Sequence, residues 1–196
     1  PVYPALLSTS IGPGQLHSEG LIAAVDALPA GAILLLHSQD LPCAAWGDVT
    51  STAASARGAL GVVCTGYVRD SATLRRGQLP VFARGSLPAR AMGRADVVLH
   101  GVKLKVCDID VEPGDLLVAD DDGVVIVPAS MQSEVLERAA VLIRRESMLR
   151  AALANGTPLG TAVAKSSANT SATSTALDGD ITQKPPTQET ARDANR

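Results

Sequence analysis

Residues 32–36 read Ala-Ile-Leu-Leu-Leu, and residues 61–64 read Gly-Val-Val-Cys. Each run is short and continuously apolar, as is typical of a strand that is covered on both faces. The small residues at 48–57 favour a helix, and Gly58 is expected to end it. Because a helix between two buried strands makes a βαβ unit, the sequence predicts an α/β fold with a mixed, partly parallel sheet.

The flanking segments add further elements to this unit. Residues 1–14 are rich in Pro, Gly and Ser and predict a loop, whereas residues 16–28 have the spacing of an amphipathic helix. Short strands are expected at 80–83, 96–99, 102–106, 116–119 and 124–127. Asp122-Gly123 indicates a tight hairpin turn between the last two, and Ser130 is expected to N-cap a long helix that ends near Ala154.

The composition of the chain excludes several functional classes. Of its 196 residues, 46% are hydrophobic but only 2% are aromatic, so small aliphatic side chains must fill the core. A net charge of −3 creates no field for polyanions, and so few aromatic rings cannot stack many bases, so nucleic acid is not an expected partner. No apolar stretch approaches the roughly 20 residues that a bilayer requires, so no membrane contact is expected.

The chain divides by composition into a domain and a tail. A single domain is expected at 1–164, since domains typically span about 100–200 residues. Residues 165–196 are rich in Ser and Thr and poor in core-forming side chains, and they are expected to be disordered. Cys43, Cys64 and Cys107 are isolated from one another, which argues against a zinc site or a redox pair. Sparse cysteines suit a reducing compartment, so a cytoplasmic location is expected.

Two segments carry residues that are suited to chemistry. Asp48 stands where a helix is expected to begin, and free backbone N–H groups there favour an anion, although Asp48 can also be a plain N-cap. Arg69 and Asp70 follow a buried strand, where α/β proteins usually bind ligands. An arginine can clamp a carboxylate and an aspartate can offer a hard oxygen to Mg²⁺, but the two can also form an ordinary solvated ion pair.

Other polar clusters favour structural interpretations. The acidic residues at 112–115 and 120–123 invite a calcium site, but the alternating Asp loop with its distal Glu is missing, so a hairpin turn is favoured. The histidines His17, His37 and His100 are scattered, and no nucleophile–base set can be assigned from their spacing.

The motifs together resemble the RraA-like family, which comprises class II 4-hydroxy-4-methyl-2-oxoglutarate/4-carboxy-4-hydroxy-2-oxoadipate aldolases and regulators of ribonuclease E activity. The pattern of that family is an Asp, twenty residues and then Arg-Asp, and Asp48 stands at this distance from Arg69 and Asp70. The resemblance runs from about residue 12 to residue 160 and includes similar segments at 57–63, 80–85, 111–115, 119–125 and 155–160.

The resemblance implies a swivelling β/β/α-type domain, assembled as a homotrimer or as a hexamer made of two trimers, with sites at the subunit interfaces. The helix and strand that this family places upstream of Gly12 are missing from the expected elements. The domain is therefore expected to be N-terminally shortened.

The resemblance also implies an activity: metal-dependent cleavage of a 4-hydroxy-2-oxo acid to pyruvate, with oxaloacetate decarboxylation as a related reaction. Asp70 would hold Mg²⁺ or Mn²⁺, and Arg69 would bind the 2-oxo acid and stabilise the pyruvate enolate. Asp48 would position a water for proton transfer from the outer shell of the metal. The backbone amides of Val49 and Thr50 would bind the substrate carboxylate.

Two alternatives remain open on the sequence. The first is a non-catalytic regulator that binds a protein partner, such as a ribonuclease or a helicase, since one fold can host either role. The second is a paralogue that has lost its function. Thr73 departs from the family pattern, because an acidic residue often stands at this place.

Overall fold

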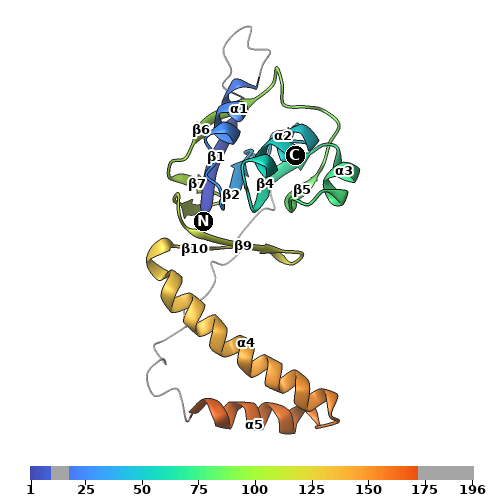
Figure 1. Ribbon diagram of the computed structural model, residues 1–196, viewed down its shortest axis with the longest axis vertical. Helices are drawn as coiled ribbons and strands as arrows, with labels where there is room; N and C mark the ends of the chain where they lie inside the picture. The colour runs from blue at the N-terminus through green and yellow to red at the C-terminus, as the bar shows by residue number, and fades with distance from the viewer. Residues whose placement is uncertain (10–17, 172–196) are drawn as a thin grey trace, which may run out of the picture. The chain divides into compact units, whose positions relative to one another are not determined.

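A computed structural model of the chain describes residues 1–9 and 18–171. The chain separates into two compact units, Pro1–Leu136 and Glu137–Arg196, which are described one at a time. Figure 1 labels most of the elements of both units.

The first unit is built on a six-stranded sheet. Its strands are β1 (Val2–Ser8), β2 (Ile33–His37), β3 (Ala44–Trp46), β4 (Gly61–Val68), β5 (Val81–Ser86) and β6 (Asp96–His100). The spatial order is β3-β4-β2-β1-β6, and β5 pairs with β4. Strands β2, β3 and β5 run parallel to β4, and β6 runs antiparallel to β1. The predicted mixed, partly parallel sheet is therefore confirmed.

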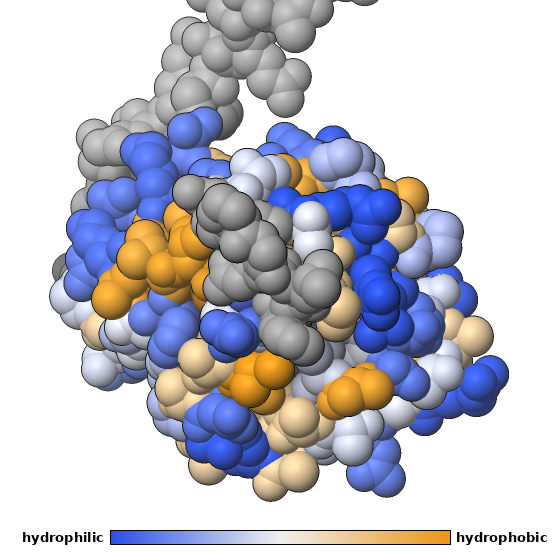
Figure 2. Space-filling view, turned by 90° about the horizontal axis from the view of Figure 1, so that it is seen from above, coloured by the Kyte–Doolittle hydropathy of each residue, from blue (hydrophilic) through white to orange (hydrophobic). Residues whose placement is uncertain are grey.

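Three helices and the sheet enclose a first core. These helices are α1 (Glu19–Asp26), α2 (Asp48–Ala56) and α3 (Ser71–Arg76). Leu34 and Leu36 of β2 pack into this core, whereas Leu35 between them packs into a second core, because neighbouring side chains of a strand point to opposite faces. This explains why β2 is apolar without alternation. Seen from above, hydrophilic residues separate several apolar patches on this side of the molecule (Figure 2).

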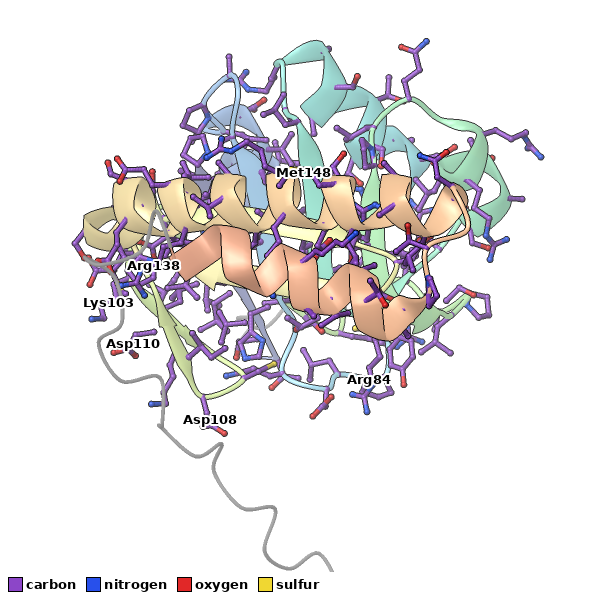
Figure 3. All side chains as sticks on the ribbon, turned by 90° about the horizontal axis from the view of Figure 1, so that it is seen from below. Arg84, Lys103, Asp108, Asp110, Arg138 and Met148 are labelled. Carbon is purple, nitrogen blue, oxygen red and sulfur yellow. The ribbon has the colours of Figure 1, made fainter. Side chains whose placement is uncertain are left out.

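Two hairpins contribute to the second core. They are β7 (Leu104–Val106) with β8 (Ile109–Val111), and β9 (Leu116–Asp120) with β10 (Gly123–Val127). Val106, Val111 and Leu117 of the hairpins pack with Leu35 and Val63 of the sheet. Lys103 pairs with Asp110 of β8, as Figure 3 allows the reader to follow, and with Glu112 directly after β8. Hairpins, sheet and helices form the β/β/α order that the resemblance implies.

The predicted N-terminal loop is wrong. Residues 2–8 form β1, which lies between β2 and β6, and Ala5 and Leu7 are buried in the first core. The burial of these side chains outweighs the loop-like composition of the segment. A strand thus precedes Gly12, contrary to the expectation that none does. Residues 10–17, including His17, lie outside the described residues.

Other boundaries differ from the prediction. The structure adds β3, β8 and α3, and it extends β4 to Val68 and β5 to Ser86. Ser130 does not cap the long helix: α4 (Gln132–Ala154) begins after a 3₁₀ turn at Ala129–Met131. Asp115 provides the hydrogen bond here, since its Oδ1 accepts from the amide of Ala129 at 2.9 Å. This partner is distant in sequence, so the local pattern could not reveal it.

The second unit contains most of α4 together with α5 (Leu159–Ser171). Arg145 Nε of α4 donates to Ser166 Oγ of α5 at 2.8 Å. Met148, on α4 in Figure 3, is exposed, as are Leu142 and Ile143. Because α5 continues to Ser171, residues 165–171 of the expected tail are helical. Residues 172–196 of the expected tail lie outside the described part of the chain.

Candidate functional site

The carboxyl ends of β3 and β4 bring together the three residues that the sequence singled out. Asp48 begins α2 directly after β3 and Gly47, and Arg69 and Asp70 join β4 to α3. The amide of Arg69 donates to the carbonyl of Trp46 at 2.9 Å, which ties the two strand ends together. The carboxyl ends of parallel strands are where α/β proteins place ligands, so this edge of the sheet is the candidate site.

Asp70 contacts both other residues of the set. Its Oδ2 lies 3.0 Å from Arg69 Nη1. The same oxygen accepts a hydrogen bond from the backbone amide of Asp48 at 3.3 Å. The side chains of Arg69 and Asp70 are 38% and 30% exposed, so a small molecule can reach the pair. The pair is thus anchored to the start of α2, unlike a freely solvated ion pair.

Gly47 provides the space for this arrangement. A Cβ at this position would lie 2.8 Å from Asp70 Oδ2, closer than real Cβ contacts, and 3.0 Å from Arg69 Nε, which is tighter than most of them. Gly47 is also the N-cap of α2, so the interpretation of Asp48 as the N-cap is wrong. Because the backbone at residue 47 is extended, Asp48 is the first helical residue.

The first turn of α2 presents the amides that were predicted to bind a carboxylate. The amide of Val49 donates to Asp48 Oδ1 at 2.7 Å. The hydroxyl of Thr50 donates to the Gly47 carbonyl at 2.9 Å and accepts from the Gly47 amide at 3.1 Å. A substrate carboxylate would therefore compete with the Asp48 side chain for the Val49 amide.

A cavity of about 530 Å³ lies at this edge of the sheet. It is lined by Asp48, Arg69, Asp70, Ser71, Ala72, Thr73, Ser86, Leu87 and Pro88. We call it the Arg69 hollow. Its volume lies in the range of ordinary small-molecule sites.

The donor set suits a hard cation. Mg²⁺ is usually held by one or two carboxylates together with water and substrate oxygens, and Asp48 and Asp70 offer carboxylate oxygens beside one hollow. Among the described residues, no group of three or more His, Cys, Asp or Glu side chains could form a complete metal cage. Thr73 lines the hollow with a hydroxyl group rather than a carboxylate.

The other polar candidates serve the structure. His37 Nδ1 lies 3.0 Å from Thr65 Oγ1, and burial lowers the pKa of this histidine. Nδ1 of His100 lies 2.8 Å from the Tyr3 hydroxyl. Asp120 Oδ1 accepts from the Gly123 amide at 3.2 Å, which confirms the hairpin interpretation of 120–123. None of these described histidines lines the Arg69 hollow.

Sequence reasoning missed the far wall of the hollow, at residues 86–88. These residues follow β5, whose register places Ser86 opposite Val68 of β4. The parallel pairing of β4 and β5 could have revealed this wall, because parallel strands end at the same edge of a sheet. The expected strand at 80–83 was too short to bring Ser86 to this edge.

Comparisons with known proteins find related sequences and related folds. A protein of Bacillus cereus that is named for 4-hydroxy-4-methyl-2-oxoglutarate aldolase activity is 31% identical over 119 residues, which cover 59% of this chain and 70% of the relative. Two further curated relatives are much longer than the matched part, since the chain spans 22% and 55% of their lengths.

Solved structures share the fold. A protein of Pseudomonas syringae pv. tomato, described as uncharacterized, matches with a TM-score of 0.75 and 27% identity, covering 84% of this chain and 74% of that one. The RNA-processing inhibitor RraA from Thermus thermophilis matches with a TM-score of 0.51 and 26% identity, covering 65% and 73%.

A family model completes the identification. The model described as RraA-like, Aldolase/RraA, matches residues 14–126, a range that contains Asp48, Arg69 and Asp70. No helix in the described residues is both long and apolar enough to cross a bilayer. Because the matched range covers more than half of its residues, the chain belongs to the RraA-like family.

Proposed function

We propose that this protein is a divalent-metal-dependent lyase that cleaves a 4-hydroxy-2-oxo acid to pyruvate. One observation carries the proposal: Asp70 Oδ2 lies within 3.0 Å of Arg69 Nη1 and 3.3 Å of the Asp48 amide, beside an open hollow. Arg69 offers a guanidinium that can bind a carboxylate, and Asp48 and Asp70 offer hard oxygen ligands for a cation. These are the groups that enolate chemistry requires. The name of the Bacillus cereus relative supports the same reaction class.

In the proposed reaction, the substrate carboxylate binds to the Arg69 guanidinium and to the amides of Val49 and Thr50. A water that Asp48 positions accepts the proton of the 4-hydroxyl group as the C3–C4 bond breaks, and the former hydroxyl becomes the C4 carbonyl of the second product. The electron pair of that bond forms the pyruvate enolate, whose charge Arg69 stabilises, and protonation at C3 gives pyruvate. Asp70 would hold a divalent cation, which would supply Lewis-acid polarisation to the 2-oxo group. Oxaloacetate would give the same enolate by losing CO₂.

The test is pyruvate release from 4-hydroxy-4-methyl-2-oxoglutarate and from oxaloacetate, first with Mg²⁺ or Mn²⁺ and then with EDTA. Asp70→Asn removes the charge but keeps a residue that tolerates the positive φ of 59° at this position. Asp40→Asn is the matched control, because Asp40 also has a positive φ, of 58°, and pairs with an arginine, Arg84, outside the hollow.

We expect pyruvate release that depends on the metal and that EDTA abolishes. Asp70→Asn should lower this release by at least about a hundredfold, whereas Asp40→Asn should leave it unchanged. A folded wild-type protein that releases no pyruvate from either substrate contradicts the lyase. Release that is equal with the metal and with EDTA contradicts the role of Asp70.

The proposal includes an assembly and a compartment. We propose a homotrimer or hexamer, because α4 and α5 expose large apolar side chains that another copy could cover, among them Leu142, Ile143 and Leu159. The three free thiols of Cys43, Cys64 and Cys107 support a reducing, cytoplasmic location.

A second candidate is a non-catalytic regulator that binds a ribonuclease or a helicase. The likeness to the RNA-processing inhibitor of Thermus thermophilis favours it. A stable complex with such an enzyme, formed by a protein that releases no pyruvate, would select this candidate over the lyase.

A further inference from the structure

A second hollow adjoins the Arg69 hollow. It has a volume of about 470 Å³ and runs between α3 and the edge strand β5. Ser71 and Ser86 line both hollows, so the two meet at the start of α3 and the end of β5. A substrate that is held at Arg69 can therefore extend its far end along α3.

Arg75 lines this second hollow. It lies one helical turn after Ser71, and residues four apart on a helix are surface neighbours, with about 5–6 Å between their Cβ atoms. Its side chain is exposed, and it forms no ion pair with an acidic residue in the described part of the chain. Arg75 is thus an available guanidinium next to the point where the hollows join.

The charges around α3 single out this arginine. A third hollow, of about 330 Å³, lies between α2 and α3 and shares Asp48 and Thr73 with the Arg69 hollow. The described residues of its wall offer hydroxyl groups but no cation. Among the described residues that line the three hollows, Arg69 and Arg75 are the cationic side chains. A second carboxylate on the substrate would find its counter-charge at Arg75.

We propose that Arg75 binds the distal carboxylate of a 4-hydroxy-2-oxo dicarboxylic acid and so sets the preference of the site for dicarboxylates. This inference rests on the proposed lyase function. Arg69 would hold the carboxylate next to the 2-oxo group, and Arg75 would hold the one at the far end. A planar guanidinium suits this role, because it can donate two parallel hydrogen bonds to a carboxylate.

The experiment compares two substrates that differ only in the distal group. These are 4-hydroxy-4-methyl-2-oxoglutarate and 4-hydroxy-4-methyl-2-oxopentanoate, in which a methyl group replaces the distal carboxylate. Pyruvate release from both is measured with the wild-type protein and with Arg75→Ala, Arg75→Lys and Arg76→Ala. Arg76 is the matched control, because it is the next arginine of α3 but lines neither the Arg69 hollow nor the second hollow.

We expect Arg75→Ala to lower kcat/KM for the glutarate by about tenfold, mainly through KM, and to leave the pentanoate within about twofold. Arg75→Lys should recover part of the loss, and Arg76→Ala should change neither substrate. Equal losses on both substrates would overturn the inference in favour of a structural role. No loss on either would also overturn it, while the lyase stands. A wild-type protein that cleaves neither substrate refutes both proposals.

Discussion

Two pairs of aspartates, Asp96 with Asp115 and Asp48 with Asp70, differ in what surrounds their carboxylates. Asp96 and Asp115 are each only 5% exposed. Asp96 accepts three backbone hydrogen bonds, from Gly20 at 2.9 Å, Leu21 at 3.0 Å and Val97 at 2.8 Å. It thereby caps α1 from a distant strand, since Ser18 makes no side-chain cap of its own. Such a carboxylate has its acceptor sites filled by the fold.

Asp48 and Asp70 form the contrasting pair. Asp70 accepts one long backbone bond, of 3.3 Å, and pairs with an arginine that is itself partly exposed. Both carboxylates line the Arg69 hollow. We propose that burial with several backbone donors marks the structural carboxylates of this fold, whereas partial exposure at the Arg69 hollow marks those that are available for a ligand. The predictions below test that distinction.

The largest effect is expected at Arg69. Arg69→Ala should cost on the order of 3 kcal/mol of transition-state stabilisation, about a hundredfold in kcat/KM, because the enolate loses its guanidinium. Stability should change by less than about 1 kcal/mol, since the ion pair is partly exposed. Pyruvate assays and urea unfolding measure the two effects. Arg84→Ala, which breaks an exposed ion pair elsewhere, serves as the control. Unchanged turnover in Arg69→Ala would refute its role.

The next effect is one of stability. Asp96→Ala should lower the free energy of unfolding by about 2 kcal/mol, because it leaves backbone N–H groups at the start of α1 without their buried acceptor. Pyruvate release below the melting temperature should persist. Asp26→Ala is the comparison, since Asp26 is exposed and forms only a surface ion pair with Arg57. Equal free energies of unfolding in Asp96→Ala and Asp26→Ala would contradict the proposed difference between buried and exposed aspartates.

The smallest effect is expected at Gly47. Gly47→Ala should lower kcat/KM by about tenfold, because the added methyl group would displace the Asp70 carboxylate and the Arg69 side chain. The melting temperature should fall only slightly, as the residue keeps an extended backbone. Gly160→Ala provides the control, because a Cβ there meets no atom within 4 Å. A Gly47→Ala protein with full activity would show that the position of the pair does not matter.

The sequence predicted the elements whose residues are locally consistent. Residues 32–36 and 61–64 are apolar throughout, and the helix between them ends at a glycine, so the βαβ unit could be predicted. Strand β1 could not be predicted, because Pro4 and the nearby Ser and Gly residues have loop-like composition. Its place between β2 and β6 is fixed by tertiary packing of Ala5 and Leu7.

The candidate site was predictable to the extent that it follows the spacing of one motif. Asp48, Arg69 and Asp70 were identified in this way, and their contacts are now explicit. The 86–88 wall and Arg75 could not be identified, because their place at the hollows depends on the parallel register of β5 and on the unpredicted helix α3. Side chains that meet only through tertiary structure leave no local signal.

The left-handed backbone at Asp70, with φ 59° and ψ 30°, restricts the evolutionary routes away from this residue. Asn keeps the turn but loses the charge, Gly keeps the turn but loses the side chain, and Glu keeps the charge but does not favour this backbone. A lineage that abandons the chemistry while retaining the fold should therefore accumulate Asn or Gly at this position. The residue type at position 70 would then distinguish descendants that keep the proposed activity from those that have kept only the scaffold.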